Sequence, residues 1–216
     1  MGKHAIVAVL CILKGSCANH HHPWIHPCMP GHRVSSESIS SDMNSLMQQR
    51  WMLHESINIA KHTARYLRLF ISRNHLQNSY LRQECLNNTL LGMPDYPSTP
   101  VVETWQDNLS NDFHRLTLLI MYVYEAKLDA MDYSDRLHNF LTQLRDAACF
   151  MENTAILSNR ELYYTVRPTS VPECYRYLPD QARRDRRNCL IARHAFDVLN
   201  VMSTTYRLIQ PPTLIQ

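Results

Sequence analysis

The sequence predicts an all-α fold, and three observations support this prediction. Only four glycines occur in the 216 residues and none follows Gly92, whereas the hairpins of sheet proteins consume glycine. The eleven prolines fall in four clusters, at 23–30, 94–100, 168–179 and 211–212. Because proline breaks helix interiors, long helices can form only between these clusters. Apolar residues recur there at helical spacing.

This spacing predicts four helices, at 41–74, 104–129, 133–157 and 181–209. The apolar stripe of the helix over 41–74 consists of Leu46, Leu53, Ile57, Ala60, Ala64, Leu67 and Ile71. The stripe over 104–129 is Phe113, Leu116, Leu119, Ile120 and Val123. The stripe over 133–157 is Leu137, Leu141, Leu144, Ala148, Met151 and Ala155. The stripe over 181–209 is Ala192, Ala195, Phe196, Leu199, Met202 and Tyr206.

Short polar residues mark the starts of these helices. Ser40 or Ser41 can cap the helix over 41–74, and Asp132 or Ser134 can cap the helix over 133–157. The helix over 181–209 follows Asp180, which we expect to be its N-cap.

The connections predict the arrangement of the four helices. The second and third helices are joined by only a few residues, so we expect them to be antiparallel neighbours. The first and last connections run for about 25–30 residues, which is uncommon inside a compact domain unless a loop crosses the length of a bundle. Long, short, long connections are typical of an up-up-down-down four-helix bundle with long crossover loops.

Composition bounds the class of protein. Hydrophobic residues make up 45% of the chain and charged residues 19%, a balance that is typical of globular domains. The length suits one domain or two small ones. The net charge of +3 is too small to indicate a nucleic-acid binder. The scarcity of glycine also argues against loops that cradle phosphate groups.

The first residues have the pattern of a secretory signal peptide over 1–18. A basic start precedes an apolar run over 5–13, and small residues follow at 16–18. A run of nine residues is too short to span a bilayer, which needs about 20; a buried N-terminal helix is the alternative. We therefore expect a secreted, extracellular protein with a tail over 19–40 and a helical domain over 41–216, and no insertion into a membrane.

Secretion favours disulfide bonds and glycosylation. The five cysteines after the signal peptide are Cys28, Cys85, Cys149, Cys174 and Cys189. Because five is odd, one of them is free or bonds to another chain, and any four allow three pairings. The sequons at Asn87 and Asn108 are candidate N-glycosylation sites.

No motif indicates an enzyme, a cofactor or a metal site. His54-Glu55 begins a zinc-protease pattern, but Asn58 stands where its second histidine would be. The histidines and Cys28 between 20 and 32 could bind copper or zinc, and we interpret them as a His-rich tail without a metal. We expect neither catalysis nor a cofactor.

A basic run marks the start of the last predicted helix, and it consists of Arg183, Arg184, Arg186 and Arg187. Asp180 and Asp185 interrupt it, so we interpret the run as a solvated helix start. The alternative is a surface that faces an acidic receptor or cell-surface glycans.

Three segments carry a resemblance to known proteins. Residues 186–196 have a basic run, a cysteine and an aliphatic-aromatic stripe, and they resemble the last helix of leukaemia inhibitory factor and oncostatin M. Residues 102–109, which include Trp105, resemble the entry to the second helix of ciliary neurotrophic factor and cardiotrophin-like cytokine. Leu144-Arg145 followed by Cys149 resembles the third helix of oncostatin M. The chain thus resembles the interleukin-6 family of long-chain helical cytokines.

The resemblance implies disulfides Cys28–Cys149 and Cys85–Cys189, with Cys174 left over. It also implies a secreted cytokine that clusters class I receptor chains, among them a glycoprotein 130-like chain, and so triggers JAK/STAT signalling. In this family the exposed faces of the first and third helices meet that chain. At 100° per residue, the large or polar residues opposite the apolar stripe over 41–74 are Trp51, Glu55, His62, Tyr66 and Leu69. The matching residues over 133–157 are Asn139, Thr142 and Asp146.

Several alternatives stay open. Trp51 could instead lie in the core, under the first long loop. Leukaemia inhibitory factor and oncostatin M place Phe and Lys at the start of the last helix, where this chain has Ala182 and Asp185, so a receptor of the leukaemia-inhibitory-factor type is in doubt. Cys174 could join the chain to a second subunit of a heterodimeric cytokine. The protein could also be a secreted helical carrier or structural protein, which an apolar cavity would indicate.

Overall fold

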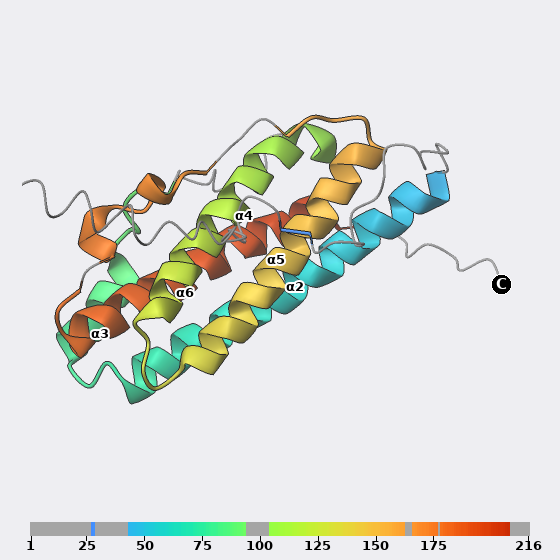
Figure 1. Cartoon of the computed structure of the whole chain (residues 1–216). Coiled ribbons are helices and arrows are strands. Elements are labelled where there is room, and N and C mark those ends of the chain that lie inside the picture. The colour runs from blue at the N-terminus through green and yellow to red at the C-terminus, as the bar shows by residue number, and fades with distance from the viewer. Residues whose placement is uncertain (1–26, 29–42, 94–103, 163–165, 177, 208–216) are drawn as a thin grey trace, which may run out of the picture.

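All regular secondary structure in the described part of the chain is helical (Figure 1). The computed structural model describes residues 27–28, 43–93, 104–162, 166–176 and 178–207. The α-helices are α2 (Met43–Asn74), α3 (Ser79–Asn87), α4 (Trp105–Leu128), α5 (Ser134–Leu157) and α6 (Gln181–Thr205). Two 3₁₀ turns, Pro168–Ser170 and Glu173–Tyr175, lie between α5 and α6. The prediction of an all-α fold is confirmed.

Some predictions fall on residues that the structure does not describe. These are the signal peptide over 1–18, the tail over 19–40 apart from Pro27 and Cys28, and the caps Ser40 and Ser41.

The four long helices match the predicted ranges closely, and three details differ. Helix α3 was not predicted; it begins after Asn78, whose side chain accepts a hydrogen bond from the Tyr80 amide at 2.8 Å. Tyr133 stands at the N-cap of α5 without a side-chain cap bond, so the prediction of Asp132 or Ser134 as cap was wrong. Helix α6 ends at Thr205 rather than 209.

The predicted cap of α6 is confirmed. The Asp180 side chain accepts a hydrogen bond from the Arg183 amide at 2.8 Å. This bond satisfies one of the free amides at the start of the helix.

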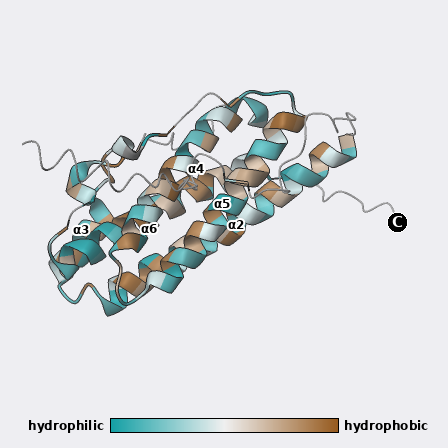
Figure 2. Cartoon of the chain, viewed as in Figure 1, coloured by the Kyte–Doolittle hydropathy of each residue, from teal (hydrophilic) through white to brown (hydrophobic). Residues whose placement is uncertain are grey.

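The buried face of α2 is a narrow seam of small and aliphatic side chains. Its members, all at most 1% exposed, are Leu53, Ile57, Ala60, Ala64, Leu67 and Ile71. Their spacing alternates between four and three residues, as in helices that pack at a small crossing angle. The seam packs between α5 and α6. Each long helix carries a hydrophilic side as well (Figure 2).

The other predicted apolar stripes are buried too, except for two residues. Leu46 on α2 and Phe196 on α6 are half-buried, and every other stripe residue named above is buried. The helix periodicity therefore identified the core faces of all four long helices.

Contacts near the helix ends show that α2 and α6 run in opposite directions. The Arg50 guanidinium, near the start of α2, donates to the Arg207 carbonyl just after α6, at 3.3 Å. Toward the end of α2, the Arg68 carbonyl lies 4.0 Å from the sulfur of Cys189, near the start of α6.

Helix α4 is antiparallel to α6, and α2 is antiparallel to α5. The Tyr206 hydroxyl, after α6, donates to Asp112 in the first half of α4 at 2.9 Å. The Arg136 guanidinium, in the first turn of α5, lies 4.1 Å from the centre of the Phe70 ring, near the end of α2.

Two disulfides tie distant parts of the chain together, Cys28–Cys149 and Cys85–Cys189. These are the pairs that the resemblance implied. They join residues 121 and 104 positions apart. Loops of this length restrict the unfolded chain strongly, and each bond stabilises the fold by about 5 kcal/mol in the entropic model.

None of the helices in the described ranges has the length and apolarity that crossing a lipid bilayer requires.

Gly92 offers a test of the loop that follows α3. Its φ of +83° favours glycine, and a Cβ added there would lie 2.7 Å from the Tyr122 hydroxyl oxygen. That hydroxyl donates to the Leu91 carbonyl. Gly92→Ala should therefore lower the free energy of unfolding by about 1–3 kcal/mol, measured by urea denaturation. In a Tyr122→Phe background the cost of the same change should be smaller, because the contact with the hydroxyl is gone. An unchanged midpoint for Gly92→Ala would contradict this account.

Candidate functional site

Helix α2 exposes a ridge opposite its buried seam. Trp51 is 37% exposed and Tyr66 is 56% exposed, and His62 is exposed between them. Glu55 and Leu69 lie on the same side and are half-buried. The five residues predicted on this helix therefore share one outward face, and the alternative that Trp51 lies in the core was wrong.

Ile59 belongs to the same surface, and the prediction missed it. Its side chain is 52% exposed, although it lies only two residues from the buried Ile57. The sequence already indicated this, because an isoleucine outside the seam, whose members are four and three residues apart, must point away from the core. The ridge of α2 is thus defined by Trp51, Ile59 and Tyr66, with His62 among them. Large side chains in such a setting are the usual anchors of protein interfaces.

The ridge borders α5. The Arg136 guanidinium lies 5.2 Å from the centre of the Tyr66 ring, as well as over Phe70. Cation–π contacts of this kind fix both partners. The exposed aromatic of α2 is therefore held against the start of α5.

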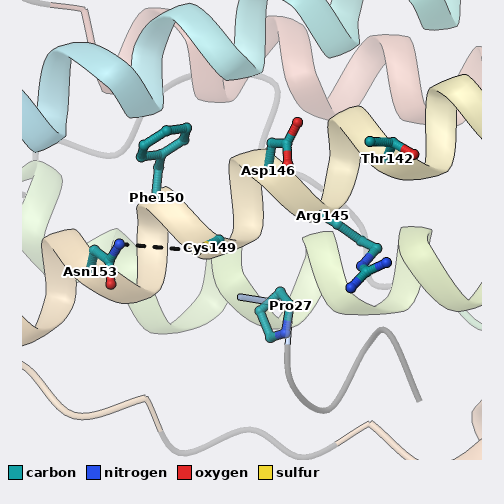
Figure 3. A pocket seen from close by; sticks show the side chains of 7 residues that line it. All are labelled: Pro27, Thr142, Arg145, Asp146, Cys149, Phe150 and Asn153. Atoms are coloured by element: carbon teal, nitrogen blue, oxygen red, sulfur yellow. Dashed lines mark hydrogen bonds between the residues drawn. The ribbon is translucent and has the colours of Figure 1, made fainter. Parts of the chain in front are cut away.

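The predicted α5 residues, Asn139, Thr142 and Asp146, are all exposed. Thr142 and Asp146 also line a surface hollow along α5, and the rest of its lining is Pro27, Arg145, Cys149, Phe150 and Asn153 (Figure 3). Figure 3 shows Asp146 and Phe150 pointing toward the side of α2, whereas Pro27 lies on the other side of α5.

The Cys28–Cys149 disulfide fixes the position of Pro27 at this hollow. The structure therefore brings Asp146 close to the α2 side, and it places Pro27 on the opposite flank of α5. The Cys28–Cys149 disulfide, which the resemblance implied, accounts for this neighbour.

Three of the four arginines in the basic run at the start of α6 are paired with carboxylates. Arg183 lies 3.1 Å from Asp180, and Arg186 lies 3.0 Å from Glu84 of α3. The interpretation of a solvated helix start was wrong for Arg187, which is 2% exposed. The Nη1 atom of Arg187 donates to Asp129 at 3.0 Å and to the Tyr175 carbonyl at 2.8 Å. This run therefore holds α6 to the rest of the domain.

Asp185 interrupts that run and is also buried. It accepts hydrogen bonds from the Tyr133 hydroxyl at 2.6 Å and from Gln181 at 2.8 Å. Burial, and then the bond to Asp185, raises the pKa of Tyr133 well above its ordinary value. Asn188 completes the network by donating to the same hydroxyl at 2.8 Å. Ala182 is exposed and carries no anchor. Of the two positions where leukaemia inhibitory factor and oncostatin M place Phe and Lys, only Asp185 is buried here, and it belongs to an internal polar network.

The remaining predicted residues are spread over the surface. Cys174 is a free, exposed thiol in the second 3₁₀ turn. Asn87 is exposed at the end of α3, where a glycan has room. Asn108 is half-buried in α4, and its amide donates to the Thr104 carbonyl at 3.3 Å. Within the described ranges, no three His, Cys, Asp or Glu side chains are grouped as a metal site requires. The His-rich stretch between 20 and 32 lies outside them, apart from Cys28.

The pairing of the basic run gives a direct prediction. Arg187→Ala should lower the free energy of unfolding by about 3–5 kcal/mol, because it leaves Asp129 without its partner. Arg183→Ala removes an exposed arginine from the same run and should change stability by less than about 0.5 kcal/mol. Chemical denaturation of both variants measures the difference, and equal effects would contradict a structural role for Arg187.

Comparisons of the chain with protein-family models, with curated proteins and with solved structures found no match. The residues described above are therefore the basis on which we propose a function.

Proposed function

We propose that this protein is a secreted helical cytokine of the interleukin-6 type. It folds as an up-up-down-down four-helix bundle of α2, α4, α5 and α6, with long connections before α4 and before α6. It performs no chemistry and needs no cofactor. It binds class I receptor chains, among them a glycoprotein 130-like chain, clusters them on the cell surface and so triggers JAK/STAT signalling.

The helix directions support the proposed topology. Helix α2 is antiparallel to α5 and α6, and α4 is antiparallel to α6. Only five residues separate α4 from α5, which also favours an antiparallel pair. Two helices running one way followed by two running back is the order of the long-chain cytokines.

The disulfides support the family. Cys28–Cys149 ties the tail to α5, and Cys85–Cys189 ties the first connection to α6. Both pairs are those that leukaemia inhibitory factor and oncostatin M imply by position. Disulfides persist in oxidising compartments, which agrees with the signal-peptide pattern over 1–18.

The observation that carries the proposal is the ridge of α2. Trp51, Ile59 and Tyr66 are exposed on one side of a rigid helix whose other side forms the central seam of the core. Exposed large apolar residues are costly to leave in water when they are grouped. A receptor that covers them gains the apolar burial and finds an anchor held in place by Arg136. The exposed residues Asn139 and Asp146 of α5 supply a polar rim beside them.

A second candidate function rests on Cys174. Its thiol is free and exposed, so it is available for a disulfide with another chain. In that case the protein would be the helical subunit of a covalent heterodimer. A non-reducing gel of the secreted protein from co-expressing cells, with and without Cys174→Ser, separates this candidate from a solitary ligand.

A carrier function has less support. The hollow beside Pro27 lies on the surface and is lined partly by Arg145 and Asp146. Charged groups at such a place do not favour the storage of an apolar ligand.

The receptor proposal predicts a loss of binding without a loss of folding. Trp51→Ala and Tyr66→Ala should each weaken binding to a glycoprotein 130-type ectodomain by about 2 kcal/mol, or roughly thirtyfold. The free energy of unfolding should change by less than about 1 kcal/mol, because both side chains are exposed. Surface plasmon resonance and urea denaturation measure the two quantities on the same preparations.

Tyr80→Ala is the matched control. Tyr80 is 64% exposed on α3, away from the ridge, and its loss should leave receptor binding unchanged. Binding that survives both ridge changes would reject the ridge as the site. The absence of binding to every chain of a class I ectodomain panel would reject the cytokine proposal itself.

A further inference from the structure

Helix α2 concentrates the positive charge of the protein. It contains Arg50, Lys61, Arg65, Arg68 and Arg73 but only one acidic residue, Glu55, so it carries a net +4 (five minus one). The whole chain carries +3. The neighbouring helix α6 carries +3 (five arginines minus two aspartates), so the rest of the chain sums to −4 and the excess of cations lies on these two helices.

Three of these cations share one flank of α2. Lys61, Arg65 and Arg68 are spaced by four and three residues, so they project from one side of the helix. They span about 10 Å along its axis at 1.5 Å per residue. We call Lys61, Arg65 and Arg68 the basic edge.

The basic edge faces α6, and contacts with that helix order it. The Lys61 ammonium donates to the Ser203 hydroxyl at 3.1 Å. The Arg68 guanidinium lies 5.5 Å from the centre of the Phe196 ring. Arg65, between them in sequence, is exposed. Two of the three cations are thus held in place before any ligand arrives, which lowers the entropic cost of binding.

No carboxylate of the described residues forms an ion pair with the basic edge. Asp197 lies on the neighbouring helix, where Arg193 pairs with it at 3.6 Å. Glu55 lies on the ridge of α2, 3.4 Å from His54. By contrast, three of the four arginines at the start of α6, which looked basic in the sequence, are paired with Asp180, Glu84 and Asp129. The basic edge of α2 is therefore a row of three cations without a carboxylate partner among the described residues.

The two flanks of α2 suit different ligands. The flank toward α5 exposes Ile59 and Tyr66, which are groups that a protein partner buries. On the flank toward α6, Arg65 is exposed, and Lys61 and Arg68 are half-buried. Such a surface suits a flexible, hydrated polyanion better than a folded partner.

We propose that the basic edge binds a sulfated glycosaminoglycan chain. Sulfate groups on successive sugars match a row of ordered cations, and such chains are the abundant polyanions outside cells. The inference rests on the proposed secretion, because the ligand is extracellular. It adds to the cytokine proposal a means of retaining the protein near cell surfaces while the ridge stays open to a receptor.

Heparin oligosaccharide binding to the purified mature protein, at physiological salt, tests the inference. The double change Lys61→Gln with Arg65→Gln should weaken binding by about tenfold, because both lost charges face the ligand. The matched control is Arg73→Gln with Arg183→Gln, which removes the same charge from two exposed sites elsewhere. The control should bind within about twofold of the unchanged protein. Thermal unfolding and circular dichroism verify that both variants are folded, and Arg65→Gln alone serves if the double variant is not.

Three results would overturn the proposal. In the first, the unchanged protein does not bind heparin. In the second, the control variant loses as much affinity as the double variant, which would show that only total charge matters. In the third result, hyaluronan, which has carboxylates but no sulfates, would bind as tightly as heparin.

Failure of this proposal is distinguishable from failure of the receptor proposal. No receptor is present in the heparin experiment, and Trp51→Ala should bind heparin like the unchanged protein. Conversely, the double variant should keep its affinity for the receptor ectodomain.

Discussion

The packing of the narrow α2 seam between α5 and α6 is the constraint on which the other features depend. Six residues, two of them alanine, bury only one side of a 32-residue helix. The two alanines let the partner helices approach closely, and the narrow seam leaves most of the helix circumference outside. The same helix therefore supplies the core and two exposed flanks. The apolar flank lies toward α5, where Arg136 contacts the Tyr66 ring. The basic flank lies toward α6, where Lys61 donates to Ser203.

Much of this could be predicted from the sequence, since helices reveal themselves by periodicity. The proline clusters bounded the four long helices, and the apolar stripes identified the residues of the core. The outward face of α2 followed from the same spacing. Ile59 was missed, although its position off the seam, two residues from the buried Ile57, indicates an outward side chain. Helix α3 escaped because nine residues give too short a pattern for periodicity to stand out.

The sequence did not show which group pairs with each charged side chain. Arg187 and Asp185 looked like solvent-exposed members of a basic run, yet both are buried, with Asp129 and Tyr133 as partners far away in the chain. Pairing across helices depends on tertiary packing, which no local pattern encodes. On α2 the sequence misled in the opposite direction. Its cations are scattered along the sequence and come together on one side only in the folded helix. In this protein, basic residues that are adjacent in the sequence are therefore not the ones that form a basic surface.

The two disulfides also have a joint consequence for the durability of the chain. The loop closed by Cys28–Cys149 and the loop closed by Cys85–Cys189 overlap. Every peptide bond between Cys28 and Cys189 lies inside at least one of them. A single proteolytic cut anywhere in that span leaves both fragments covalently joined, and the bundle can stay assembled around the break. A protease can thus cut either of the two long connections once without releasing either fragment.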